Sequence, residues 1–268
     1  MNNKKLIIYI FLAYLFSWII SVPLAINYLS GNNENFLIHY LTAFGPLFSA
    51  IVTTYIFSGL KGLKDYFKKF ISIKLNKTLF FTLFSPVIFF IISAFIALLL
   101  GESINLQNIG KIKYLDNIGI VGSLFLWIFT FGIGEESGWR GFALVELQKK
   151  YSFKLSTVIL SIIWFCWHIP FFIYNDNLAQ GGFVSIMMYG LSLFSGTVVL
   201  SFLFNKNGNA ILPVAIWHGV FNWVTASEGL PSQIPMIMSI IVVAWAIFIW
   251  QNTEKSIQTN YGKRNHTR

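Results

Sequence analysis

The chain has 268 residues, of which 56% are hydrophobic and only 11% are charged, and its mean hydropathy is +0.66. These values exclude an ordinary soluble domain and favour a polytopic membrane protein, because apolar runs of about 20 residues can span a bilayer. The net charge of +9 does not indicate nucleic-acid binding, since the basic residues lie in short loops between apolar runs. The single cysteine, Cys166, excludes an internal disulfide and a multi-cysteine metal site.

Eight apolar segments follow one another along the chain, and each is predicted to be a transmembrane helix. The fold class is therefore expected to be all-α, with one transmembrane domain over residues 1–251 and a polar cytoplasmic tail over residues 252–268. The approximate ranges of the segments are Leu6–Ile26, Phe36–Phe57, Leu79–Leu100, Ile118–Leu147, Leu155–Tyr174, Phe183–Phe204, Ala210–Ala226 and Pro235–Trp250.

The distribution of basic residues predicts the orientation in the membrane. If both termini are cytoplasmic, every Lys and Arg except Lys111 and Lys113 falls on the cytoplasmic side, as the positive-inside rule requires. The basic segment Gly59–Lys77, which includes Lys74, is expected to form an amphipathic helix on the cytoplasmic leaflet. The frequent use of Lys, Asn, Ile and Phe suggests AT-rich coding and a bacterial cell membrane.

The fourth segment contains Glu135, Glu136 and Arg140 in an otherwise apolar run. A charged side chain at membrane depth costs about 3 kcal/mol or more, so such residues are rare and usually functional. On a helix Glu136 and Arg140 are four residues apart and can pair, whereas Glu135 points about 100° away from Glu136. A break at Gly134 or Gly138 would bring this cluster nearer the cytoplasmic interface. The alternative is a structural ion pair that joins two helices.

Two other segments also carry polar groups at membrane depth. His168 lies in the fifth segment, and His218 and Asn222 lie four residues apart on one face of the seventh. His39, near the outer end of the second segment, is expected to be an interfacial residue. Each of the deep groups alone could be a hydrogen-bonding residue between helices. Together with the Glu-Glu-x-x-x-Arg cluster they favour one shared site.

The residue types at this site fit hydrolysis. A buried carboxylate can take a proton from water, a histidine can help to hold that water, and a second histidine and an amide N–H can stabilise an oxyanion. The same set could instead bind zinc through Glu135, His168 and His218 with an open fourth position. The absence of a His-Glu-x-x-His motif argues against the metal. The sequence also lacks a Gly-x-Ser-x-Gly motif, which argues against a serine hydrolase.

The sequence resembles the CPBP intramembrane proteases, whose three motifs it carries in order. The first is Glu135-Glu136-x-x-x-Arg140, the second is an aromatic residue four positions before a histidine (Trp164 and His168), and the third is His218-x-x-x-Asn222. That family includes the type II CAAX prenyl proteases and bacterial relatives linked to bacteriocin processing and self-immunity. The motifs cover residues 134–222, within a motif region of about 118–227. Trp164 stands where the family often has Phe, a departure that is expected not to affect the chemistry.

The resemblance implies a role for each residue of the site. Glu135 would be the general base that activates water, His168 would position that water, and His218 and Asn222 would form the oxyanion site. Glu136 and Arg140 would orient and neutralise the cluster. Members of the family have been described both as metalloproteases and as metal-independent glutamate proteases. We expect the metal-independent form, without a cofactor, and zinc is the alternative.

The expected function is therefore that of an intramembrane endopeptidase, a peptidase of the glutamic or metallo type, with its active site open to the cytoplasmic side. Its partners would be the lipid bilayer and a peptide or protein substrate in or at the membrane, either of the prenylated type or a short peptide precursor. No nucleic-acid partner is expected. The alternative is a non-catalytic membrane immunity or transport protein that uses the polar cluster for binding.

Overall fold

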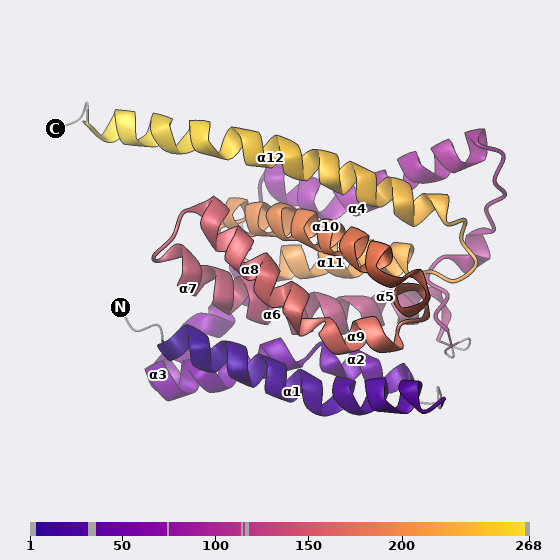
Figure 1. Ribbon diagram of the computed structural model, residues 1–268. Coiled ribbons are helices and arrows are strands. Elements are labelled where there is room, and N and C mark those ends of the chain that lie inside the picture. The colour runs from indigo at the N-terminus through magenta and orange to yellow at the C-terminus, as the bar shows by residue number, and fades with distance from the viewer. Residues whose placement is uncertain (1–3, 32–35, 74, 114, 116–117, 266–268) are drawn as a thin grey trace.

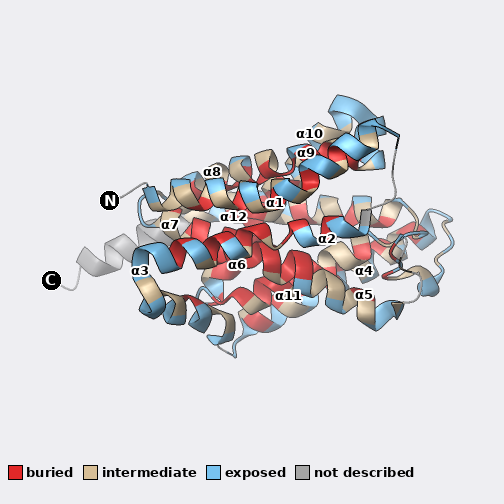
Figure 2. Cartoon of the chain, turned by 90° about the horizontal axis from the view of Figure 1, so that it is seen from below, coloured by how far each residue is buried: buried red, intermediate tan, exposed pale blue. Residues whose placement is uncertain are grey.

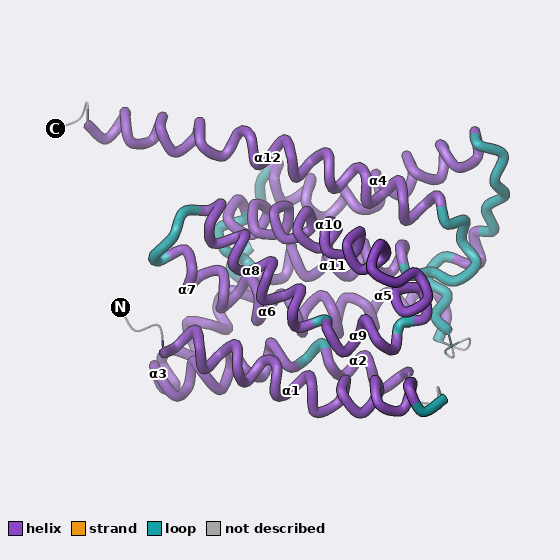
Figure 3. The backbone as a smooth tube through the Cα atoms, in the orientation of Figure 1, coloured by secondary structure: helices purple, strands orange, loops and turns teal. Residues whose placement is uncertain are grey.

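A computed structural model describes residues 4–31, 36–73, 75–113, 115 and 118–265, without the side chains of residue 36 and residues 254–265. All regular secondary structure in these ranges is helical, as the all-α prediction requires (Figure 3). The long helices run roughly side by side and form a bundle (Figure 1). Lys74 of the predicted basic segment and the last three residues of the predicted tail lie outside the described residues.

Each of the eight predicted apolar segments corresponds to one or more helices. In chain order these are α1 (Lys4–Leu29), η1 (Phe36–Ile38), α2 (His39–Thr42), α3 (Gly45–Ile71), α4 (Lys77–Leu99), η2 (Leu106–Asn108), α5 (Gly119–Trp127), η3 (Ile128–Glu135), α6 (Glu136–Gly138), η4 (Trp139–Leu144), α7 (Val145–Gln148), α8 (Phe153–Trp167), α9 (Ile169–Tyr174), α10 (Asp176–Lys206), α11 (Ile211–Thr225) and α12 (Gln233–Asn265).

By length and composition, six helical stretches of the described chain can cross a membrane, which supports a polytopic membrane protein. Two further apolar helices, α8 and α11, have only 15 residues each. At 1.5 Å per residue each is about 22 Å long, which is shorter than the hydrocarbon core of a bilayer. Buried positions are concentrated on α6 and α11 (Figure 2), whereas α8 has exposed apolar side chains at Leu155 and Ile162. His218 therefore lies on one of the innermost helices, and His168 directly follows α8.

The predicted fifth span is divided into two helices, so its prediction as one continuous helix was wrong. α8 ends at Trp167 and α9 begins at Ile169, and His168 between them has φ −81° and ψ −2°. Pro170 lies in the first turn of α9, where its missing N–H is tolerated. In the interior of one long helix the same proline would remove a hydrogen bond. The break sets His168 at a helix junction.

The stretch between the fifth and sixth predicted segments, residues 175–182, is mostly helical, although it lies outside both. α10 already begins at Asp176, and its direction changes at Gly182, where φ is 61° and ψ is −150°. α3 changes direction in the same way at Gly59, with φ 58° and ψ −160°. Only glycine adopts this backbone conformation readily. In α3 the change separates the apolar part of the helix from the basic part, which stays helical to Ile71.

The fourth segment is one continuous helical path from Gly119 to Gln148, without the break considered at Gly134 or Gly138. Two stretches of it, η3 and η4, are π-helical. π turns are rare and are frequently found at functional sites. Gly134 allows a close approach to the start of the second span, because a Cβ atom there would lie 2.5 Å from the carbonyl oxygen of Ala43.

The connecting segments fall into two groups at opposite ends of the bundle. At one end, which we call the N/C end, α1 begins and α12 ends (Figure 1), and Lys5 pairs with Glu146 at 3.1 Å. At the other, the opposite end, Asp176 accepts a hydrogen bond from Tyr28 at 3.2 Å and pairs with Lys113 at 3.3 Å. The loops predicted to lie on one side of the membrane therefore contact one another.

Candidate active site

Glu136, Arg140 and His218 form a buried polar cluster. The side chains of Glu136 and Arg140 are fully buried, and Arg140 Nη1 donates a hydrogen bond to Glu136 Oε1 at 2.8 Å. His218 Nδ1 lies 2.8 Å from the same oxygen atom. The i,i+4 pair expected from the sequence is thus present, and it also reaches α11. This cluster connects the fourth segment to the helix that carries His218.

Glu135 lies beside this cluster and faces a different neighbour. It is 1% exposed, and its Oε2 atom accepts a hydrogen bond of 2.7 Å from Trp164 Nε1. Among the described residues Glu135 makes no ion pair. Of the two adjacent carboxylates, one is therefore neutralised by an arginine and the other is held by an uncharged donor.

Trp164, whose departure from Phe was expected not to affect the chemistry, contacts Glu135 directly. Phenylalanine has no donor and could not make the hydrogen bond to Glu135. The Trp164 ring also lies 4.4 Å from the guanidinium carbon of Arg140, within the range of a cation–π contact. Its other neighbour is the ring of His218, which packs edge-on with a centroid distance of 5.6 Å. Trp164 thus contacts Glu135 as well as the cluster of Glu136, Arg140 and His218.

A cavity of about 260 Å³ adjoins the cluster. Glu135, His168, His218 and Asn222 line it, whereas Glu136 and Arg140 do not. The six residues singled out in the sequence are therefore brought to one place but divided into a cavity-facing set and a supporting pair. Much of the remaining wall is aromatic and includes Trp127, Phe131, Trp167, Phe171, Tyr189 and Phe221.

Hydrogen bonds fix the orientation of both histidines. His168 Nδ1 lies 2.7 Å from the carbonyl oxygen of Trp164, and a carbonyl oxygen can only accept, so this nitrogen carries the proton. In the neutral ring Nε2 of His168 is then an acceptor. His218 Nδ1 likewise donates to the carboxylate of Glu136. The partner of Nδ1 thus helps to set whether the Nε2 atom of each histidine is a hydrogen-bond donor or an acceptor towards the cavity.

His39, which was expected to be an interfacial residue, also lines the cavity. It is 9% exposed, and its Nδ1 atom lies 2.8 Å from the hydroxyl of Tyr174. The partner is 135 residues away in the chain, so no local spacing in the sequence could have indicated the contact. Its position inside an apolar run was the one available signal.

Glu135, His168 and His218, the three residues of the zinc alternative, all line the cavity. Among the described residues, no three His, Cys, Asp or Glu side chains are grouped so that they could hold a metal ion. The Nδ1 atoms of His168 and His218 are both engaged by other partners, and the second ring nitrogen of a metal-ligating histidine is usually held in the same way. We therefore derive no chemical step through a metal.

Comparisons with known proteins agree with the motifs. Residues 117–224 match a family model described as type II CAAX prenyl endopeptidase Rce1-like. The chain is also 29% identical over 172 residues to CAAX prenyl protease 2 of Methanococcus maripaludis. The resemblance to the CPBP intramembrane proteases is confirmed. All six site residues lie inside the range matched to this family. The alignment covers 59% of this chain and 60% of the Methanococcus relative, so it spans about three fifths of that protein.

Proposed function

We propose that the chain is an intramembrane endopeptidase in which Glu135 is the general base. The observation that carries this proposal is the division between the two carboxylates. Glu135 lines the cavity, while Glu136 is paired with Arg140 outside its wall. A carboxylate that keeps one oxygen for a proton and faces a space large enough for substrate meets the geometric requirement for a general base.

In this mechanism a water molecule binds between Glu135 and His168. Glu135 Oε2 is occupied by Trp164, so Oε1 takes the proton of the water. The Nε2 atom of neutral His168 accepts the second hydrogen of the water, because its Nδ1 proton is committed to the Trp164 carbonyl. The hydroxide oxygen then bonds to the carbonyl carbon of the scissile peptide. Glu135 later returns the proton to the leaving amine.

The oxyanion that forms in this step needs hydrogen-bond donors on the cavity wall. Asn222, one helical turn beyond His218, can donate from its amide group. His218 can donate from Nε2 when both of its nitrogens carry protons, and its Nδ1 atom lies 2.8 Å from the Glu136 carboxylate. The role of the Glu136–Arg140 pair is to hold His218 for this purpose.

The substrate class follows from the cavity and from the relative. The aromatic wall favours an uncharged, apolar peptide segment. The Methanococcus relative is named a CAAX prenyl protease, and for this chain we propose a membrane-associated peptide, either of the prenylated type or a short precursor. We place both termini in the cytoplasm, because the basic residues are so unevenly distributed. The frequent use of Lys, Asn, Ile and Phe supports a bacterial cell membrane.

The test compares cells that produce the wild type, Glu135→Gln or Glu146→Gln. Glu146 is the matched control, because it lies in the same helical segment but pairs with Lys5 and Lys149 at the N/C end. Membrane and secreted peptides are compared by mass spectrometry. We expect a peptide that is truncated with the wild type and with Glu146→Gln, and uncut with Glu135→Gln, which should lose about 10²–10⁴ in rate.

Two outcomes would count against this function. Full cleavage by Glu135→Gln would remove Glu135 from the mechanism. Identical peptidomes for all three proteins, with the cellular phenotype retained by Glu135→Gln, would instead favour a binding, immunity or transport role.

A further inference from the structure

Most of the cavity wall lies towards the opposite end of the bundle. On α10 the wall runs from Leu200 to Tyr189, and on α11 it runs from Trp217 to Ala226, which directly follows that helix. It includes Ser21 in the later part of α1, Tyr174 at the end of α9 and Ala226 directly after α11. These three positions lie near helix ends that point away from the N/C end.

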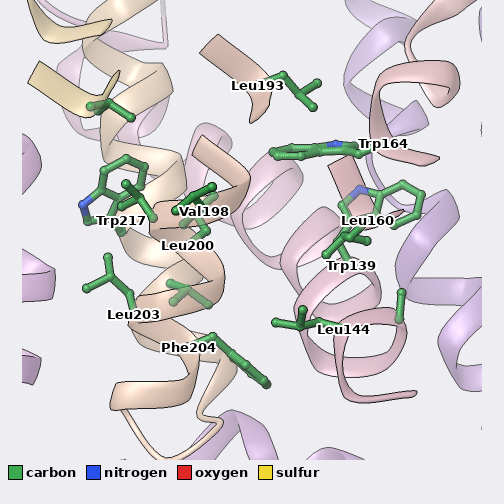
Figure 4. Packing of buried hydrophobic residues seen from close by; sticks show 14 of the residues in the cluster. Trp139, Leu144, Leu160, Trp164, Leu193, Val198, Leu200, Leu203, Phe204 and Trp217 are labelled. Atoms are coloured by element: carbon green, nitrogen blue, oxygen red, sulfur yellow. The ribbon is translucent and has the colours of Figure 1, made fainter. Parts of the chain in front are cut away.

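Between Glu135 and the N/C end the bundle is filled with side chains. Leu144, Leu160, Leu203, Phe204 and Ile211 are each 0% exposed. Leu144, Leu203 and Phe204 pack beyond Trp164 and Trp217 (Figure 4). A core packed at ordinary protein density leaves no path for a peptide.

The wall of the cavity reaches the surface at the opposite end. Ala226 is exposed, whereas Glu135 at the inner limit of the cavity is 1% exposed. Ala226 is followed by the turn in which the Glu228 N–H donates to the carbonyl oxygen of Lys111 at 3.0 Å. The cavity wall therefore extends to a surface residue beside the loops of the opposite end.

Charge identifies which side of a membrane this end faces. Lys111 and Lys113 are the two basic residues of its loops, while the remaining Lys and Arg residues belong to segments of the N/C end or to the tail. The positive-inside rule therefore assigns the N/C end to the cytoplasm. With cytoplasmic termini, this end of the cavity faces away from the cytoplasm, whereas the sequence led us to expect an active site open to the cytoplasm.

We infer that substrate reaches Glu135 from the extracytoplasmic side of the membrane. This inference rests on the proposed function. The substrate is then a peptide exposed at the outer surface, either an exported precursor or the outer part of a membrane-bound segment. Its residues near the scissile bond are apolar and uncharged, because the cavity wall contains one carboxylate, that of Glu135, and no Lys or Arg among the described residues.

Cysteine labelling tests the direction of access. The native Cys166 is first replaced by Ala, and single cysteines are then introduced as Ala226→Cys at the cavity mouth and Ser72→Cys at the N/C end. Both positions are exposed, and Ser72 directly follows α3. A charged, membrane-impermeant maleimide is applied to intact and to permeabilised cells. Reaction of both variants after permeabilisation is the control for folding and reactivity.

We expect Ala226→Cys to react in intact cells at nearly its rate in permeabilised cells, and Ser72→Cys to react only after permeabilisation. Reaction of Ala226→Cys no faster than Ser72→Cys in intact cells would overturn the inference. The labelling does not require catalysis, so it remains informative if Glu135→Gln shows that the proposed function is wrong. If cleavage is established, labelled Ala226→Cys should also lose it, while labelled Ser72→Cys should keep it.

Discussion

Replacing Trp164 by Phe tests the contact that sequence analysis missed. The substitution keeps an aromatic face towards Arg140, which lies 4.4 Å from the present ring, but it removes the Nε1 donor. Glu135 Oε2 then loses its hydrogen bond of 2.7 Å and is left buried without that partner. The carboxylate can rotate, and its second oxygen no longer has a fixed direction towards the cavity.

The size of the effect follows from the strength of the lost bond. A hydrogen bond to a charged group contributes about 1.5–3 kcal/mol. If all of it serves to orient the base, the loss corresponds to about 10- to 150-fold in rate, since 1.36 kcal/mol is a factor of ten. We expect this loss in kcat rather than in KM, because the remaining aromatic wall of the cavity is unchanged.

Trp223→Phe is the matched control. Trp223 Nε1 donates to the Ser123 hydroxyl at 2.9 Å, so the same chemical group and a similar bond are lost away from Glu135. Cleavage of the peptide identified by mass spectrometry is measured for both variants in detergent, together with the melting temperature. A wild-type kcat for Trp164→Phe, or an equal loss in both variants, would refute the role of Trp164 as the residue that positions Glu135.

Two further predictions concern packing and metal dependence. Gly134→Ala should lower the melting temperature, because its Cβ atom would lie 2.5 Å from the Ala43 carbonyl oxygen and overpacking costs about 1–3 kcal/mol. Gly196→Ala is the control, since nothing lies within 4 Å of a Cβ there, and an equal loss in both variants would contradict the packing argument. Treatment with 1,10-phenanthroline should leave cleavage unchanged, because no described His, Cys, Asp and Glu side chains are grouped as metal ligands. Inhibition that added zinc reverses would contradict it.

Local sequence patterns were sufficient for the helices and for the Glu136–Arg140 pair. Both depend on spacing within one segment, either apolar runs of sufficient length or charged residues four positions apart. Pro170 was also visible, but its effect on the fifth segment was not recognised. The break that it produces is what places His168 at a helix junction.

The contacts between segments could not be predicted in this way. The Trp164–Glu135 bond joins residues 29 positions apart, and the His39–Tyr174 bond joins residues 135 positions apart. The π-helical stretches of the fourth segment also have no periodic signature in the sequence. Such contacts depend on how whole helices pack, and a single sequence does not specify that packing through local spacing.

The two adjacent carboxylates, Glu135 and Glu136, are both buried but have different partners. A buried charge is costly unless it is paired and hydrogen-bonded. Glu136 meets that cost through Arg140 and His218, each 2.8 Å from the same oxygen. Among the described residues, Glu135 is held by a single hydrogen bond from the indole N–H of Trp164, although it is nearly as buried. A fold that needed only an ion pair between helices would gain nothing from this second acid. Its cost is understandable if water and substrate in the adjoining cavity complete its surroundings during the reaction.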